Sequence, residues 1–143
     1  WDKQRRNTPV VVMEVLPGLE VSIDALCWNG ELLAHAARTK VEENIQVVSS
    51  EHPVIEHVRA LAKRFRLHGV VSFQYREDQH RNWKILEINA RPSGGCIYSE
   101  DAGFRILTYW ARLVAGLMKP EEVQQVRGEV TLDLKRVATR RAC

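Results

Sequence analysis

Two oxygen-bearing side chains stand close together in the segment KILEINARPSGG, residues 84–95. Alternate residues of a strand share a face, so Glu87 and Asn89 project together while Leu86 and Ile88 project to the opposite face. An acid and an amide on one face can both offer oxygen atoms to a hard cation. Whether a cation could bind here depends on the side chains that the neighbouring strand adds.

A third oxygen donor, Gln74, lies on the preceding predicted strand, residues 70–76, which the polar loop EDQHRN joins to residues 83–89. The apolar faces of both strands pack on one core, and a slip by one residue would turn every side chain over. The loop midpoint then places Gln74 opposite or diagonal to Glu87. In this alternation Ile85 falls on the face of Glu87.

The oxygen atoms of Gln74, Glu87 and Asn89, of which only Glu87 is charged, suit Mg²⁺, which keeps bound water and takes further oxygens from phosphate. Zinc would need histidine or cysteine ligands, and neither is in this group. Periodicity alone favours a simpler alternative, a polar sheet face that is hydrogen-bonded to a loop.

The elements that must position these residues follow from the hydrophobic pattern and the turn signals. Asn29-Gly30 predicts a tight hairpin turn. We predict strands at 9–15, 20–28, 31–37, 70–76, 83–89 and 129–137, a helix from Ser50, its N-cap, to Leu67, a helix at 104–115, a helical turn at 120–126, and irregular segments at 39–50 and 91–103. This is an α+β fold with antiparallel sheets and packed helices.

The composition of the 143-residue chain fits about one globular domain, with 45% hydrophobic and 27% charged residues. No apolar run reaches the roughly 18 residues of a membrane span. Three cysteines without CxxC spacing predict reduced thiols and a cytoplasmic location. The net charge is +3, and Arg136, Arg140 and Arg141 form a basic tail that we expect to be solvated. No aromatic residue interleaves them, which argues against nucleic acid as a partner.

The remaining charged and titratable residues carry no clear chemical pattern. The five histidines show no pair at metal-ligand spacing, so surface or capping roles are expected. Arg38 and Lys40 are predicted to be solvated charges, and Asp24 to be structural.

The segments FQYRED and KILEINARPSGG together resemble the metal-binding end of the ATP-grasp superfamily. Within that superfamily they are most similar to the carbamoyl-phosphate synthase large-chain type. The resemblance implies that Gln74, Glu87 and Asn89 hold Mg²⁺, with Mn²⁺ as an alternative, under the phosphates of ATP. Arg91 would be the catalytic residue that reaches phosphate or an acyl-phosphate intermediate. Residues 93–95 would form a loop whose backbone N–H groups approach a substrate anion.

The segment VVMEVLPGLEVSID resembles the ATP-grasp hinge followed by the ribose-binding acid. By that resemblance Met13, Glu14, Val15 and Leu16 offer a backbone edge to adenine. Glu20 would accept hydrogen bonds from the ribose hydroxyls.

The resemblance implies that residues 1–143 are the C-terminal part of an ATP-grasp domain: hinge and meander at 10–38, helix, metal-site hairpin, loop and helix at 51–116, and a C-terminal helix or strand with the basic tail at 117–143. The N-terminal half of the same protein would be its partner. Small-molecule carboxylate and nucleophile substrates are implied, the carboxylate being activated as an acyl phosphate for attack by an amine or similar group. This part alone is expected to be inactive. The alternative is a non-catalytic module that docks a partner or polyanion through the basic tail.

Overall fold

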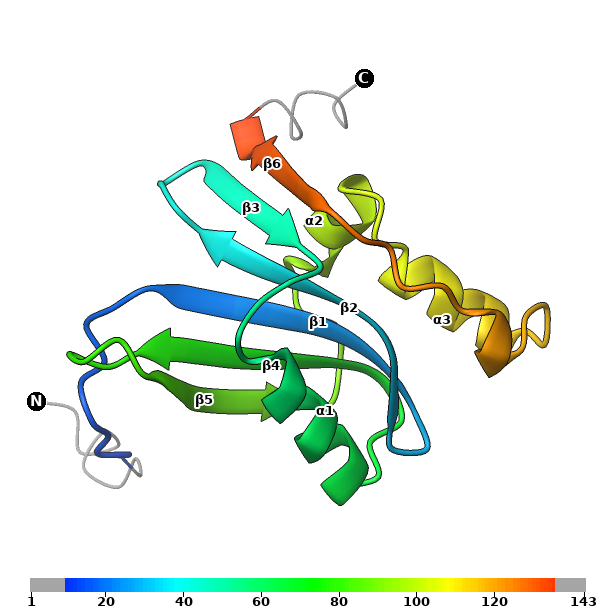
Figure 1. Ribbon diagram of the computed structural model, residues 1–143, viewed down its shortest axis with the longest axis horizontal. Coiled ribbons are helices and arrows are strands. Elements are labelled where there is room, and N and C mark those ends of the chain that lie inside the picture. Colours follow the sequence, from blue (N-terminus) through cyan, green and yellow to red (C-terminus); the bar gives the residue numbers. More distant parts are fainter. Residues whose placement is uncertain (1–9, 136–143) are drawn as a thin grey trace, which may run out of the picture.

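A computed structural model describes residues 10–135, which form one sheet with helices packed on both of its faces (Figure 1). The sheet has six strands in the order β5-β4-β1-β2-β3-β6, and each is antiparallel to its neighbour. The strands are β1 Glu20–Trp28, β2 Glu31–Lys40, β3 Ile45–Ser49, β4 Gly69–Glu77, β5 Trp83–Asn89 and β6 Glu129–Asp133. The helices are α1 Ile55–Arg64, α2 Cys96–Asp101 and α3 Ile106–Val114, with a 3₁₀ turn at Pro120–Glu122. The predicted α+β class is confirmed.

One face of the sheet is covered by α1 (Figure 1). Val58 of α1 packs in a cluster with Ile23 of β1 and with Phe73 and Tyr75 of β4, all at most 1% exposed. Burial of each such large side chain contributes about 1.5–3 kcal/mol, so this cluster is the main core of the domain.

The opposite face is covered in part by α2 and α3. Leu26 of β1 packs with Phe104 and with Ile106 of α3 in a second buried cluster. Glu100 of α2 joins the two helices, because its Oε2 accepts a hydrogen bond from Thr108 Oγ1 at 2.7 Å. The part of this face nearer the start of β1 carries polar side chains instead.

Two predicted elements differ from the structure. The described part of the expected strand at 9–15 forms no strand, and its valines are exposed, as at Val12 with 95%. A β-branched run favours extended backbone, but a strand also needs a neighbour to pair with. The segment 39–50, expected to be irregular, instead contains the end of β2 and all of β3. β3 pairs with β2 on one side and with β6 on the other.

Two further predictions, both for helical segments, also differ from the structure. The helix predicted from Ser50 begins at Ile55, and Ser50 is not its cap. Ser50 instead exchanges hydrogen bonds with Gly128: its N–H donates to the Gly128 carbonyl at 2.9 Å, and its Oγ accepts from the Gly128 N–H at 3.0 Å. The segment 91–103, predicted to be irregular, contains α2.

Candidate functional site

The three predicted metal ligands lie together on the sheet face that α2 and α3 cover in part. Gln74 of β4 pairs directly with Glu87 of β5, which confirms the predicted register, and Ser72 pairs with Asn89. The Asn89 amide nitrogen donates a hydrogen bond to Glu87 Oε1 at 2.6 Å. Side chains opposite each other across an antiparallel pair lie about 5 Å apart at Cβ, so Gln74, Glu87 and Asn89 form one group, which we call the β4–β5 cluster.

The prediction for Ile85 was wrong. The pairing shifts by one residue between Gln74 and Tyr75, so that Ile85 rather than Leu86 lies opposite Tyr75. This β-bulge leaves Leu86 as the extra residue and turns Ile85 to the α1 face. Glu87 keeps its place beside Gln74.

The donor set of the β4–β5 cluster fits a hard divalent cation. It offers oxygen atoms and a single negative charge, and Glu87 is exposed to solvent, where a cation that keeps water ligands can enter. The Asn89 nitrogen is used by Glu87, so the Asn89 carbonyl oxygen is the atom left to face a cation. Within residues 10–135, no three His, Cys, Asp or Glu side chains gather as metal ligands, so a metal site here depends on the two amide oxygens.

Arg91 follows the cluster directly and is exposed. Its Nη1 donates to the carbonyl of Pro92 at 3.1 Å. No ion pair with Arg91 occurs in the described part of the chain. An exposed guanidinium beside a group of oxygen donors is suited to bind an anion that the cation also contacts.

Beside the cluster, on the same face, Asp24 and Arg38 form a buried ion pair. Arg38 Nε donates to Asp24 Oδ2 at 2.6 Å, and the two side chains are 7% and 1% exposed. Ser93 Oγ and Ser99 Oγ donate to the same carboxylate at 3.0 and 2.7 Å. We call these four residues the Asp24 network. It joins strands β1 and β2 to the loop after β5 and to α2.

The prediction that Arg38 is a solvated charge was wrong, whereas Lys40 is exposed as expected. Arg38 is drawn inward because a buried carboxylate needs a charged, multiply hydrogen-bonded partner. The sequence signal was weak: an acid inside the alternating strand 20–28 and an arginine after the small residues of strand 31–37.

The predicted nucleotide edge, residues 13–16, has no regular secondary structure, and Met13 and Val15 are 61% and 85% exposed. Its backbone role stays a prediction. Glu20, the predicted ribose acid, starts β1 and lies 4.0 Å from Arg76 Nη1. Arg76 Nε also donates to the Gly18 carbonyl at 3.1 Å, which fixes the approach of this segment to β4.

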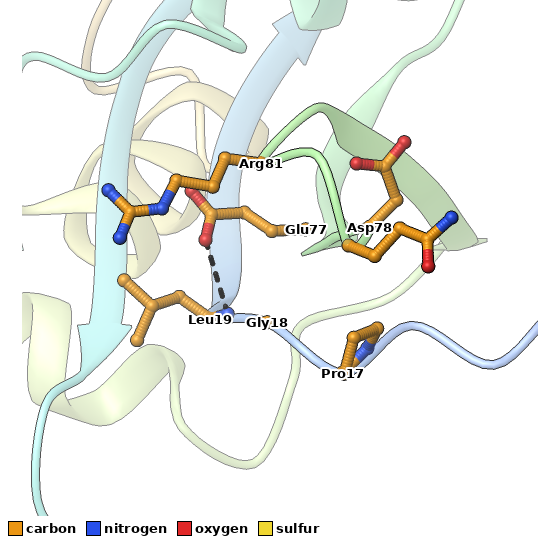
Figure 2. Close-up of a pocket in the computed structure, with 7 residues that line it drawn as sticks. Pro17, Gly18, Leu19, Glu77, Asp78 and Arg81 are labelled. Carbon is orange, nitrogen blue, oxygen red and sulfur yellow. Dashed lines mark hydrogen bonds between the residues drawn. The ribbon is translucent and has the colours of Figure 1, made fainter.

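A pocket lies where the chain enters β1, beside the turn between β4 and β5 (Figure 2). It is lined by Pro17, Gly18, Leu19, Glu77, Asp78, Gln79 and Arg81. The N–H of Leu19 donates to Glu77 Oε2 at 3.4 Å, the dashed line in Figure 2. None of the β4–β5 cluster residues lines this pocket, so the structure places it apart from the predicted metal ligands.

The Asp78 carboxylate in this pocket accepts hydrogen bonds from the backbone of the turn in which it lies. Its Oδ1 accepts from the backbone N–H groups of Asn82 and His80 at 2.9 and 2.8 Å. These hydrogen bonds, those to Asn82 first, lower the pKa of Asp78 to about 2. Asp78 therefore shapes the β4–β5 turn rather than offering a free base.

The expected surface role was wrong for His35, which is 7% exposed. Its Nε2 bonds with the Ser50 carbonyl at 2.9 Å, and burial lowers its pKa. The basic tail of Arg136, Arg140 and Arg141 lies outside the described residues. No helix within residues 10–135 is long and apolar enough to cross a membrane.

Comparison with known proteins identifies sequences that are similar to this chain. A family model described as "ATP-grasp in the biosynthetic pathway with Ter operon" matches residues 6–138. The carbamoyl phosphate synthase large chain of Agathobacter rectalis is 27% identical over 126 residues, which cover 78% of this chain and 12% of that protein. The chain thus spans about an eighth of the length of this curated relative.

Solved structures share the fold at low sequence identity. The L-amino acid ligase from Bacillus licheniformis has a TM-score of 0.57 and 15% identity, covering 82% of this chain and 35% of that one. The biotin carboxylase subunit of pyruvate carboxylase has a TM-score of 0.56 and 17% identity, covering 82% and 30%. At such identities the similarity concerns the fold alone.

Proposed function

This chain belongs to the ATP-grasp family described as acting in the biosynthetic pathway with the Ter operon, and from that premise we propose that it is the ATP- and Mg²⁺-binding portion of a ligase. The complete enzyme activates a carboxylate as an acyl phosphate, which an amine or similar nucleophile then attacks. The similarity covers about a third of the solved structures that the chain resembles. We expect this portion to be inactive alone, because phosphoryl transfer depends on positioning and charge neutralisation from both sides of the nucleotide. The location is cytoplasmic.

The observation that carries the proposal is the β4–β5 cluster. Gln74 lies opposite Glu87, and Asn89 is bonded to Glu87, on an accessible part of the sheet face. These three residues hold the divalent cation, which when bound neutralises phosphate charge and orients the terminal phosphate.

The protein's own groups then bind and orient the reactants. Arg91, exposed and without an ion pair in the described part of the chain, stabilises the negative charge that develops during phosphoryl transfer. The backbone of residues 13–16 binds the adenine edge, and Glu20 accepts hydrogen bonds from the ribose hydroxyls. Positioning by these groups accounts for most of the catalysis expected in this kind of reaction.

The test uses the full-length protein with Glu87→Gln, which keeps the size of the side chain and removes its charge. Mn²⁺ binding in the presence of ATP, followed by electron paramagnetic resonance, is expected to weaken about tenfold or more, because a direct ligand matters at least as much as its supporting groups. Glu31→Gln makes the same chemical change at an exposed position by the Asn29–Gly30 turn and is expected to bind Mn²⁺ normally. Equal Mn²⁺ affinity in both variants would contradict the proposed metal site.

A further inference from the structure

Ser93 stands at the junction between the candidate site and the buried interior. It follows Arg91 by two residues, and it is held by both members of a buried ion pair. Arg38 Nη2 donates to Ser93 Oγ at 2.9 Å, and Ser93 Oγ donates to Asp24 Oδ1 at 3.0 Å. A hydroxyl with one donated and one accepted bond to charged groups has little freedom to move.

The ion pair that holds Ser93 is itself fixed. Asp24 Oδ2 accepts from Arg38 Nε at 2.6 Å and from Ser99 Oγ at 2.7 Å, while Oδ1 accepts from Ser93 and, at 3.4 Å, from Arg38 Nη2. Asp24 belongs to β1 and Arg38 to β2, two inner strands of the sheet. The Asp24 carboxylate is therefore fixed within the sheet, and a hydrogen bond to it fixes the position of the loop after β5.

Gly95 brings the same loop against Arg38. A Cβ atom at Gly95 would overlap the Arg38 guanidinium, whereas one at the neighbouring Gly94 would meet nothing within 4 Å. The loop thus touches the ion pair at Ser93, through a hydrogen bond, and at Gly95, through direct backbone contact. Arg91 is the one charged residue of this loop, residues 90–95. Its side chain is exposed, and it precedes both contacts in the sequence.

We infer that Ser93 is a positioning residue: its hydroxyl, bonded to the Asp24–Arg38 pair, sets where Arg91 stands relative to Glu87 and Asn89. This inference rests on the proposed function, since it takes Arg91 as the group that meets the terminal phosphate of ATP. Ser99 gives the same carboxylate an equivalent hydroxyl bond but lies in α2, beyond the loop, and only secures that helix.

The two serines make a matched pair for the test. Ser93→Ala and Ser99→Ala each remove one hydroxyl donor from Asp24, and both are made in the full-length protein. Titration calorimetry with MgATP and with MgADP is the measurement, since only ATP carries the terminal phosphate. Ser93→Ala is expected to weaken MgATP binding about tenfold and MgADP binding less than about twofold, in the range seen when a supporting group is lost. Ser99→Ala is expected to leave the ratio of the two affinities unchanged.

Arg91→Ala and Ser93→Thr separate the ways this can fail. Arg91→Ala is expected to lose the preference for MgATP, and a preference that survives would contradict the proposed function itself. If Arg91→Ala loses the preference but Ser93→Ala behaves as Ser99→Ala does, only the positioning role is overturned. Ser93→Thr retains the hydroxyl and is expected to restore the wild-type ratio. Thermal unfolding of each variant establishes that it is folded, and a Ser93→Ala protein that unfolds is replaced by Ser93→Cys, a weaker hydrogen-bond partner of similar size.

Discussion

Two carboxylates on one sheet face, Asp24 and Glu87, lie in opposite surroundings. Asp24 is 1% exposed, and both of its oxygens accept hydrogen bonds from Arg38 and from serine hydroxyls. Glu87 is exposed, and the one hydrogen bond found for it among the described residues comes from the Asn89 amide beside it. Asp24 of β1 pairs with Ser72 of β4, and Ser72 pairs with Asn89 of β5, two residues along the strand from Glu87.

This difference distinguishes a carboxylate that supports the fold from one that the proposed function assigns to a cation. The bonds of Asp24 are all used inside the protein, so its charge contributes to holding strands, loop and α2 together. The oxygens of Glu87 keep capacity for an external cation. A carboxylate that stabilises the fold and one that is kept free for a ligand are expected to differ widely in how much stability their mutation costs.

The largest expected effect is that of Asp24→Asn, which keeps the shape and removes the charge. Arg38 then stays buried without its counter-ion, and the loss of unfolding free energy is about 3–5 kcal/mol. Urea unfolding followed by tryptophan fluorescence measures it. The double variant Asp24→Leu/Arg38→Met buries no charge and is expected to be more stable than Asp24→Asn alone. A loss below about 1 kcal/mol in the single variant would mean that the pair is not buried as described.

A smaller effect is expected at the point where the loop meets the ion pair. Gly95→Ala places a Cβ atom on the Arg38 guanidinium and is expected to cost about 1–3 kcal/mol, the usual cost of overpacking. Gly94→Ala, one residue earlier and with open space around it, is expected to change the unfolding free energy by less than about 0.5 kcal/mol. Equal effects at the two glycines would mean that Gly95 does not pack closely against Arg38.

The sequence predicted the β4–β5 hairpin well because both strands alternate and both apolar faces need the same core. That alternation placed Gln74 opposite or diagonal to Glu87, and the structure pairs the two residues directly. The face of Ile85 could not be predicted, because a single bulged residue, Leu86, reverses the alternation, and a bulge leaves no pattern of its own in the composition.

A second bulge explains why the Asp24 network escaped prediction. The Asn29–Gly30 turn alone would pair Arg38 with Val21, on the apolar α1 face. The register shifts by one residue between Leu26 and Cys27, so that Arg38 pairs with Ser22 and comes within reach of Asp24. The strand predicted at 9–15 was wrong for a different reason, because no strand of the described residues pairs with its described part, 10–15.

Alkaline pH gives a further test of the buried region, through Cys96. Burial, and then the nearby Asp24 charge, raise the pKa of this thiol from 9.0 to about 12. The folded state thus keeps the proton while the unfolded state loses it, so stability is complete below pH 9 and falls as pH rises from 9 towards 12. The loss is about 1 kcal/mol by pH 10. Urea unfolding across this range measures it, and in Cys96→Ala the slope is expected to be shallower; an unchanged slope would place the titrating group elsewhere.

The smallest effect on stability is expected on the exposed side of the comparison, at Glu87→Gln. The side chain contacts solvent and the Asn89 amide, and glutamine can accept the same hydrogen bond, so the unfolding free energy changes by no more than about 0.5 kcal/mol. Urea unfolding without metal, beside Asp24→Asn as the contrasting variant, measures this. The sign carries information as well, because a residue kept for a ligand is often neutral or slightly unfavourable for the unliganded fold. A loss of several kcal/mol at Glu87 would make it a structural residue like Asp24, and the contrast between the two carboxylates would disappear.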